Sequence, residues 1–363
     1  MLETPAIVID EEVMINNIQK MADHAKKHDV LLRPHIKTHK IPEIAGRQID
    51  AGAAGITCAK VAEAEVMASE GITNIFIAYP IVTPEKIKRF LALSKTIDIT
   101  VGVDSSAGAK ALSKAAAEAD QTVKVRLEVD VGLKRTGVKY EKAVELAKQI
   151  YQLNNLEFTG IYTFKGAIIN GKATLDLQGA GAEEGQLMTE LADSLKREGI
   201  IIQEVSAGST PTSGSVAEVS GITEIRPGTY VFYDRMQKTL GVCGFKDCAA
   251  RVIATIVSIP SDDLLIIDGG SKTFATDVQP NTEPLNLQGF GYIVNYPEAV
   301  LERLTEEHGM VKIDPGYSFQ IGDTLEIIPN HVCSTINLHN YVYIKQANGG
   351  LCKTEVLARG KLE

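Results

Sequence analysis

Short apolar runs alternate with longer amphipathic stretches over the first two-thirds of the chain. Eight of the runs are rich in β-branched residues, whereas stretches such as 11–28 and 140–153 repeat their apolar residues every three or four positions against a charged face. Strands that alternate with helices build a parallel sheet, and eight such units predict a (β/α)8 barrel in an α/β chain. The predicted strands are residues 30–37, 55–60, 74–79, 97–104, 123–130, 158–164, 204–209 and 223–230.

The pattern changes near residue 241, where runs separated by Gly, Asp and Pro turns show little helical periodicity. We therefore predict a barrel domain at 10–240, followed by a mostly β domain at 241–363 that residues 1–9 are expected to join. The segment LERLTEEHG at 301–309 is predicted as a short helix or a charged turn. The predicted strands of the β domain lie in residues 250–259, 263–270, 323–332 and 340–347.

Composition narrows the class of protein. The chain has 363 residues, 44% of them hydrophobic, which is enough for more than one domain core. Its net charge of −9 disfavours nucleic acid as a partner, because such binding relies on Lys and Arg. The N-terminus lacks the features of a signal peptide, and no stretch is long enough to cross a bilayer. Five scattered cysteines do not describe a disulfide framework. We expect a cytoplasmic protein with reduced thiols and no membrane partner.

Chemically active residue types gather where the predicted barrel strands end, which is where such barrels carry their active sites. Strand one ends in Lys37, with His35 and His39 on either side. Lys37 is a candidate amine for a covalent bond to an aldehyde, and the imidazoles are candidate bases. By itself, however, Lys37 is one of 37 Lys and Arg residues, most of which solvate the surface. Arg135, in a glycine-bounded loop after strand five, either approaches an anionic or phenolic oxygen or is solvated on an ordinary turn.

Small and hydroxylated residues follow strands seven and eight. Gly208, Ser209 and Thr210 come after strand seven, and Gly228 and Tyr230 lie at the end of strand eight. These loops usually bind phosphate in such barrels, since their backbone N–H groups and hydroxyls are open to an anion. Alone, such residues are ordinary turn formers. Combined with a lysine at the end of strand one, they describe a site for an aldehyde phosphate, pyridoxal phosphate (PLP).

His331 and Cys333 flank Val332 in a segment that is predicted to be β. Alternation along a strand puts both side chains on one face, where imidazole and thiolate can share a metal ion. A thiolate ligand suits zinc or a similar borderline metal. The other interpretation is a hydrogen-bonded histidine near a buried cysteine, and two ligands alone leave the two interpretations even.

With these residues in view, the sequence resembles the fold-type III PLP enzymes, and within them the family of D-threonine aldolases and D-serine dehydratases. The resemblance extends over nearly the whole chain. Its strongest segment is RPHIKTHK at 33–40, which resembles the family's cofactor-lysine motif. The other matching segments are VDVGLKRTGV (129–138), GSTPT (208–212), EIRPGTYVFYD (224–234), IDGGSKTF (267–274) and PNHVCSTINL (329–338).

The resemblance implies roles for the residues at the strand ends. Lys37 would bond the PLP aldehyde, Arg135 would approach its phenolic oxygen, and Arg226 would approach its ring, as in alanine racemases. Phe164 and Ala167 stand where many relatives have Tyr and His. Phe164 can still stack on the ring, whereas a hydroxyl and an imidazole are lost. The residues implied around the cofactor phosphate are Gly208, Ser209, Thr210, Gly228 and Tyr230.

The implied activity is that of a lyase acting on small D-amino acids that carry a hydroxyl on Cβ. Two reactions are possible. Retro-aldol cleavage would use His35 or His39 as base, dehydration would use Lys37 as base, and the sequence supports the two almost equally. Cys333 favours dehydration, because the resemblance gives His-x-Cys to the dehydratases and His-x-Asp to aldolases that favour harder ions. Similarity to bacterial aldolases of low specificity favours cleavage.

The remaining expectations concern the metal, the assembly and the competing functions. His331 and Cys333 would hold a divalent metal, namely zinc, manganese, magnesium or cobalt, in a homodimer. An amino-acid racemase is the second enzyme considered, but it would leave His331 and Cys333 without a purpose. A non-catalytic PLP carrier is the third candidate, but such carriers lack the β domain.

Overall fold

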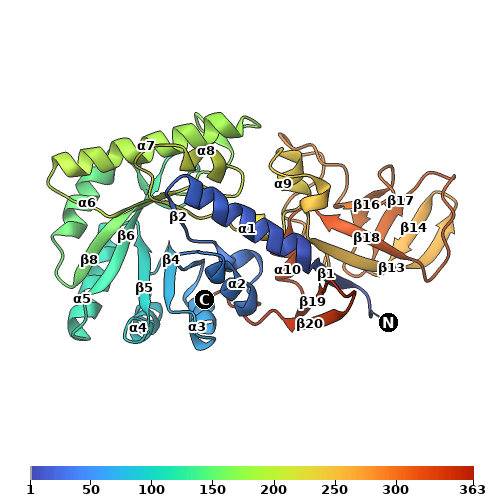
Figure 1. Ribbon diagram of the computed structural model, residues 1–363, viewed down its shortest axis with the longest axis horizontal. Helices are drawn as coiled ribbons and strands as arrows, with labels where there is room; N and C mark the ends of the chain where they lie inside the picture. Colours follow the sequence, from blue (N-terminus) through green and yellow to red (C-terminus); the bar gives the residue numbers. More distant parts are fainter. Residues whose placement is uncertain (1) are drawn as a thin grey trace. The chain divides into compact units, whose positions relative to one another are not determined.

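The computed structural model describes residues 2–363, and this part of the chain forms two compact units. Figure 1 shows the course of the chain through both units. No helix within these residues is both long and apolar enough to span a bilayer. The barrel unit consists of residues 19–37, 42–228 and 360–363, and the β unit of residues 2–18, 38–41 and 229–359.

Eight parallel strands form the barrel unit. They are β2 (Leu31–Leu32), β3 (Ile56–Cys58), β4 (Asn74–Pro80), β5 (Asp98–Val103), β6 (Val123–Asp130), β8 (Leu156–Tyr162), β11 (Glu204–Ala207) and β12 (Glu224–Ile225). Neighbours pair in the order β2, β12, β11, β8, β6, β5, β4, β3. The sheet closes because β2 pairs with β12, while His35, just beyond β2, forms a parallel bridge with Thr57 of β3. The predicted (β/α)8 barrel is confirmed.

Amphipathic helices lie outside these strands (Figure 1). Local sequence fixes where they begin: the Ser105 hydroxyl accepts the Gly108 N–H at the start of α5, and the Asp176 carboxylate accepts the Gly179 N–H at the start of α7. Helix α1 (Glu11–Lys27) begins in the β unit and ends in the barrel unit. The other helices are α2 (Pro42–Asp50), α3 (Val61–Ser69), α4 (Pro84–Leu93), α5 (Ser106–Glu118), α6 (Ala143–Tyr151), α7 (Leu177–Arg197) and α8 (Ser213–Ala217).

The first and last barrel strands are shorter than predicted, with two residues each. Pro34 and Pro227 lack the backbone N–H that a strand ladder needs, so regular pairing stops before them. The His35 N–H still donates to the Pro227 carbonyl oxygen over 3.0 Å. The chain then forms 3-10 turns at Ile36–Thr38 and Thr229–Val231. The two predicted strands therefore end in tight turns, and these turns carry the residues after strands one and eight.

The β unit is built around a mixed sheet. Its strands are β1 (Ala6–Asp10), β13 (Ala250–Ser261), β14 (Leu264–Ile267), β15 (Gly291–Ile293), β16 (Val300–Leu304), β17 (Gly309–Lys312), β18 (Thr324–Pro329), β19 (Tyr341–Lys345) and β20 (Leu351–Glu355). Strand β1 lies antiparallel to β13 and parallel to β19. Every second residue at the start of β13 is buried, beginning with Ala250 and Val252, as expected for a strand with one face in a core.

The segment 301–309 forms no helix, so that alternative of the prediction is wrong, whereas a charged turn is present at 305–308 between two strands. Strands β16 and β17 form an antiparallel hairpin there, and β17 also pairs with β14. Leu301 is completely buried, whereas the intervening charged residues form the exposed end of the hairpin, where the Thr305 N–H donates to the His308 carbonyl. The charged residues are compatible with a helix or with a hairpin. Burial of the apolar positions against β14 favours the hairpin.

His331 and Cys333 do not lie in a strand, so the alternation argument for them is wrong. Strand β18 ends at Pro329, His331 precedes the short helix α10 (Val332–Ile336), and Cys333 lies within this helix. The buried Asp234 carboxylate explains the turn, because its Oδ2 accepts the Val332 N–H over 3.0 Å. Its other oxygen accepts an N–H at the start of α9 (Arg235–Thr239). Burial raises the pKa of Asp234 to about 6.

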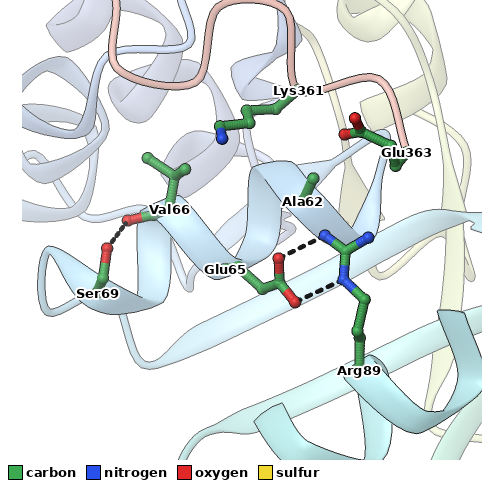
Figure 2. Close-up of a pocket in the computed structure, with 7 residues that line it drawn as sticks. All are labelled: Ala62, Glu65, Val66, Ser69, Arg89, Lys361 and Glu363. Carbon is green, nitrogen blue, oxygen red and sulfur yellow. Dashed lines mark hydrogen bonds and ion pairs between the residues drawn. The ribbon is translucent and has the colours of Figure 1, made fainter. Parts of the chain in front are cut away.

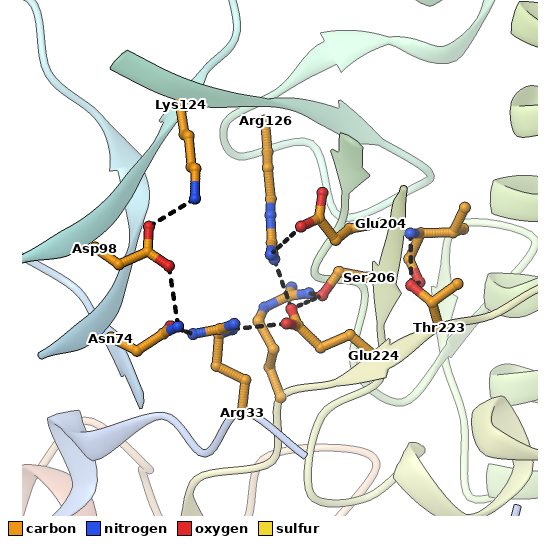
Figure 3. Close-up of polar contacts among 11 residues, drawn as sticks. Arg33, Asn74, Asp98, Lys124, Arg126, Glu204, Ser206, Thr223 and Glu224 are labelled. Atoms are coloured by element: carbon orange, nitrogen blue, oxygen red, sulfur yellow. Dashed lines mark hydrogen bonds and ion pairs between the residues drawn. The ribbon is translucent and has the colours of Figure 1, made fainter. Parts of the chain in front are cut away.

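A buried ionic network around Glu224 lies inside the barrel (Figure 3). The Glu224 carboxylate accepts from Arg33 Nε and from one Arg126 nitrogen, each over 2.6 Å, and from the Ser206 hydroxyl over 2.5 Å. Burial would raise the pKa of Glu224, but the positive charges of Arg126, Arg33 and Arg226 outweigh it and lower the pKa to about 2. Glu224 therefore stays ionised inside the barrel.

We predict that Glu224→Gln destabilises the barrel by about 3–5 kcal/mol, because it leaves guanidinium groups buried without their anion. Asp98→Asn is the matched control. Asp98 bonds Lys124 in a half-exposed pair of the same network, and the loss should stay under about 1 kcal/mol. Urea unfolding followed by circular dichroism measures both. Equal stability of Glu224→Gln and the wild type would contradict this account.

The Glu224 effect should also depend on pH. Its folded-state pKa of about 2 lies below the ordinary value of 4.5, so ionised Glu224 stabilises the fold above pH 4.5 and this stabilisation is lost as pH falls towards 2. The difference in unfolding free energy between the wild type and Glu224→Gln should therefore be full at neutral pH and shrink on acidification.

Candidate functional site

Lys37 lies where the first barrel strand runs out, in the turn after β2. Its half-buried side chain places Nζ 5.4 Å from the centroid of the Phe164 ring. The Arg135 guanidinium lies 5.0 Å from the same centroid. Two cationic side chains from different loops thus lie near one phenyl ring, which is the arrangement that an anionic, aromatic ligand would complement.

Carboxylates at the end of β6 form hydrogen bonds that hold the loop carrying Arg135. The Asp130 side chain accepts the N–H groups of Gly132 and Lys134 over 2.9 and 3.0 Å. The Thr136 hydroxyl donates to Glu128 over 2.7 Å. Burial raises the pKa of Glu128, which is 4% exposed. The position of Arg135 therefore depends on acidic groups at the end of β6, the strand that precedes the loop.

The loop after β11 is held from outside the barrel by Glu184 of α7. This buried carboxylate accepts the Gly208 N–H over 3.2 Å and the Thr212 hydroxyl over 3.0 Å. Gly208 has φ +83°, and a Cβ there would lie 3.3 Å from the Ser213 Cα, so glycine suits both the conformation and the space. The Ser209 N–H bonds the Thr212 hydroxyl over 3.1 Å. The predicted phosphate loop is thus a constrained turn.

Residues after β12 approach the same loop. The Gly228 N–H donates to the Thr210 hydroxyl over 3.2 Å. Arg226 is 7% exposed and donates to the Ser206 hydroxyl and the Thr163 carbonyl oxygen. Its guanidinium lies 5.3 Å from the centroid of the Tyr162 ring. Within the barrel unit, the structure thus brings together the segments that sequence analysis assigned to PLP.

The end of strand six offers few groups that can carry protons. Tyr162 is buried and its hydroxyl donates to Glu128 over 3.1 Å. Burial raises the pKa of Tyr162 well above its ordinary value. Lys165 is completely buried and forms an ion pair with Glu183 over 2.9 Å. Beyond the strand, Phe164 supplies an unreactive ring. The lost Tyr and His are therefore not replaced at these positions by a free titratable side chain.

Of the two imidazoles that flank Lys37, His39 packs in the β unit. It is completely buried, its Nδ1 accepts the Ile41 N–H over 3.1 Å, and its ring meets Phe232 edge-on. His35 is half-buried, and its Nδ1 accepts the Lys37 N–H at 3.5 Å. Tyr230, predicted near the phosphate, also packs in the β unit and is completely buried.

His331 and Cys333 interact at the start of α10. Cys333 is 9% exposed, and its Sγ lies 3.1 Å from the Thr38 hydroxyl and 3.4 Å from the Thr229 hydroxyl. Burial would raise the pKa of Cys333, but the charge of His331 and hydrogen bonds lower it. Burial would lower the pKa of His331, but the charge of Cys333 and the hydrogen bond that His331 donates to Asp277 hold it well above its ordinary value. The pair can thus supply a thiolate.

Within residues 2–363, no group of three or more His, Cys, Asp or Glu side chains is arranged to hold a metal ion. A polar pocket of about 450 Å³ in the barrel unit is lined by residues of α3, by Arg89 and by residues of the 360–363 segment (Figure 2). The paired side chains there are Arg89 and Glu65. None of the predicted site residues lines this pocket, so it is separate from the candidate chemistry.

Four functional neighbours were missed from the sequence: Glu128, Glu184, Asp234 and Asp277. Each is a carboxylate that acts across a long sequence separation or from another element. Spacing carries no signal for such contacts. Asp277 comes three residues after the matched segment IDGGSKTF, which is the nearest pointer that the sequence contains.

Comparisons with known proteins agree with this arrangement. The "Alanine racemase, N-terminal domain" family model matches residues 9–236, and a serine dehydratase domain model matches residues 249–345. The chain is 30% identical to D-threonine aldolase from Arthrobacter sp. over 99% of its length and 93% of the relative. It is 30% identical to D-threo-3-hydroxyaspartate dehydratase from Delftia sp. (strain HT23) over 92% of each chain.

Solved structures give the same result. D-threonine aldolase from Filomicrobium marinum superposes with a TM-score of 0.89 and 28% identity, covering 100% of this chain and 97% of the other. The Delftia dehydratase superposes with a TM-score of 0.90 at 30% identity, covering 98% of this chain and 97% of the other, and a variant of it has been solved in a metal-free form.

The barrel and the β unit that follows it define an alanine-racemase-like enzyme. Both halves of the chain match in order, and the relatives that span nearly all of it are aldolases and dehydratases. The chain belongs to the alanine racemase N-terminal domain family and, within it, to the lyases that act on D-β-hydroxy-α-amino acids. The family expected from the sequence is confirmed.

We predict that Thr136→Val loosens the loop that carries Arg135, because it removes the hydroxyl that bonds Glu128. One lost hydrogen bond of about 1 kcal/mol should speed trypsin cleavage after the exposed Lys134 and Arg135 by about fivefold. Cleavage elsewhere in the barrel is the internal control. Glu128→Gln keeps an oxygen acceptor and should have a smaller effect. Unchanged cleavage of Thr136→Val would show that this bond does not hold the loop.

Proposed function

We propose that the protein is a PLP- and divalent-metal-dependent lyase that dehydrates small D-β-hydroxy-α-amino acids to a keto acid and ammonia. The choice of dehydration rests on which side chains of the candidate site can accept or donate a proton. Lys37 is present at the end of the first strand, whereas the end of strand six presents Phe164 and Ala167. Retro-aldol cleavage is the competing reaction.

The barrel residues fit PLP. Lys37 and Arg135 lie over the Phe164 ring, so an amine, a cation and a stacking surface are present together. The turn at Gly208 has a positive φ and close neighbours that favour glycine, and Glu184 accepts its N–H. PLP, when bound, supplies an electron-accepting ring that lets a bond to the substrate Cα break. The residues proposed to bind it are Lys37, Arg135, Phe164, Gly208, Ser209, Thr210, Arg226, Gly228 and Tyr230.

The donor set at α10 fits a borderline metal. His331 and Cys333 interact directly, and the pKa of the buried thiol is lowered rather than raised. A metal ion can replace the proton that such a pair shares, since metal binding requires a thiolate and a neutral imidazole. Thiolate and imidazole favour zinc or cobalt over magnesium. The ion would supply Lewis-acid polarisation of the substrate hydroxyl.

Proton transfer separates the two reactions. Retro-aldol cleavage needs a base for the β-hydroxyl proton, whereas dehydration needs a base for the Cα proton. Lys37 would hold the cofactor, and its free amine would be a base of the second kind. At the end of strand six, the Tyr162 hydroxyl is buried against Glu128 and Lys165 is paired with Glu183. His35 remains a candidate for the first role, and His39 is enclosed.

We further propose that the barrel domain at 10–240 carries the cofactor, and that the β domain at 241–363, with residues 1–9, carries the metal. The position of His331 and Cys333 at the start of α10 in the β unit supports the placement of the metal. We also expect a cytoplasmic homodimer, and light scattering of the purified enzyme tests the dimer.

Incubation with D-serine, D-threonine and D-3-hydroxyaspartate should release keto acid and ammonia, with little glycine or aldehyde. Keto acid and aldehyde are measured separately, with and without a chelator, and the L-isomers are the matched controls. The chelator should stop turnover, because the metal is assigned to the substrate hydroxyl. Glycine and aldehyde as the main products would replace dehydration by retro-aldol cleavage. Racemised substrate without either product would favour the racemase.

Lys37→Ala should abolish the visible absorption band of lysine-bound PLP, because no other lysine is assigned to the cofactor aldehyde. Lys40→Ala is the control, since Lys40 is in the same motif but its Nζ bonds the Ala358 carbonyl in the β unit. The band should persist in that variant if it folds, as judged by its melting curve. Retention of the band in Lys37→Ala would refute the assignment.

A further inference from the structure

Asp277 contacts the candidate metal ligand His331 from the side of one ring nitrogen. Its Oδ2 lies 2.5 Å from His331 Nδ1 and accepts a hydrogen bond from the Ser334 hydroxyl over 3.0 Å. Ser334 itself lies 3.4 Å from His331 Nδ1. Asp277, Ser334 and His331 thus contact one another at the start of α10. Asp277 lies outside all the sequence motifs that resemble the family.

The segment before Asp277 is fastened to the same helix. The Ala275 N–H donates to the Thr335 hydroxyl over 3.3 Å, and this hydroxyl donates to the His331 carbonyl oxygen over 2.8 Å. Phe274, the residue before Ala275, is completely buried. Asp277 therefore approaches His331 from a backbone whose place is fixed, although its own side chain is 46% exposed.

A hydrogen bond at Nδ1 determines what the other ring nitrogen can do. A carboxylate that accepts from Nδ1–H holds the proton on that nitrogen, which leaves the Nε2 lone pair free for a metal. It also fixes the plane of the ring and makes Nε2 a stronger donor. Because Asp277 uses its oxygen on Nδ1, it occupies the side of the ring opposite to Nε2.

We propose that Asp277 is a positioning residue that orients His331 and fixes its tautomer for metal binding, with Ser334 holding the carboxylate in place. This inference rests on the proposed function, because it requires that His331 and Cys333 bind the ion. It adds to that function a residue in the second coordination sphere. Asp277 contacts His331 and does not itself bind the metal or the substrate.

The test is a cobalt(II) titration of the PLP-loaded enzyme in competition with a chelator. Asp277→Asn should weaken cobalt affinity about 10–100-fold, because the amide no longer fixes the tautomer. The thiolate-to-cobalt absorption should persist at saturation, since Cys333 still binds. Asp277→Glu keeps the carboxylate and should recover part of the affinity, and Ser334→Ala should weaken it less than Asp277→Asn. Asp262→Asn, the same charge change at an exposed position of the β unit, should leave it unchanged.

The outcomes separate this inference from the function on which it rests. Wild-type affinity in a folded Asp277→Asn variant would overturn the role of Asp277, while the thiolate-to-cobalt band would still support the metal site. A changed band at saturation in Asp277→Asn would make Asp277 a direct ligand and also overturn the inference. A wild-type enzyme that shows no such band, and whose cobalt affinity is unaffected by Cys333→Ser, would refute the metal site itself.

Discussion

The ionised Glu224 carboxylate inside the barrel is the interaction on which the arrangement of the site depends. It joins Arg33, which follows the first barrel strand, to Arg126 of the fifth, and it begins the last strand itself. First and last strands must pair for a barrel to close, and these two strands have only two residues of regular ladder each. The charge network therefore supports closure where the hydrogen-bonded ladder is shortest. Lys37 follows the first of these strands and Arg226 follows the second. The positions of both residues therefore depend on the charge network.

Buried carboxylates recur wherever a loop of the site has to be held. Glu184 reaches the loop after β11 from α7, and Glu128 reaches the Arg135 loop from the strand beneath it. Asp234 begins two helices of the β unit at once. A carboxylate accepts several N–H or O–H donors, which offsets the cost of its burial. Hydrogen bonds to these carboxylates therefore constrain each loop, as the pre-organisation of a site requires.

The sequence predicted those parts of the fold that depend on local periodicity. All eight barrel strands were predicted because parallel, doubly covered strands are continuous apolar runs, and the strand at 123–130 was predicted with its observed bounds. Predictions failed where a distant partner decides the structure. Strands β16 and β17 exist because β14 buries their apolar positions, and α10 begins where it does because Asp234 accepts the Val332 N–H. The residue types of the site were visible in the motifs, whereas the roles of the carboxylates that hold them were not. Asp130 and Asp234 lie inside matched segments, but their hydrogen bonds become visible only in the folded chain.

The two replacements at the end of strand six connect the fold to the choice of reaction. A phenylalanine at 164 keeps a ring against which Lys37 and Arg135 lie, so stacking needs no hydroxyl there. An alanine at 167 removes a base but leaves the strand intact, because β8 already ends at Tyr162. The nearby hydroxyl of Tyr162 is a poor substitute, since it donates a hydrogen bond to Glu128 and burial keeps its pKa high. Under the proposed function, Phe164 would still stack on the cofactor, whereas Phe164 and Ala167 offer no group that could deprotonate a substrate hydroxyl. These residues support the proposed dehydration, in which Lys37 would act at Cα, and they leave His35 as the candidate base for cleavage.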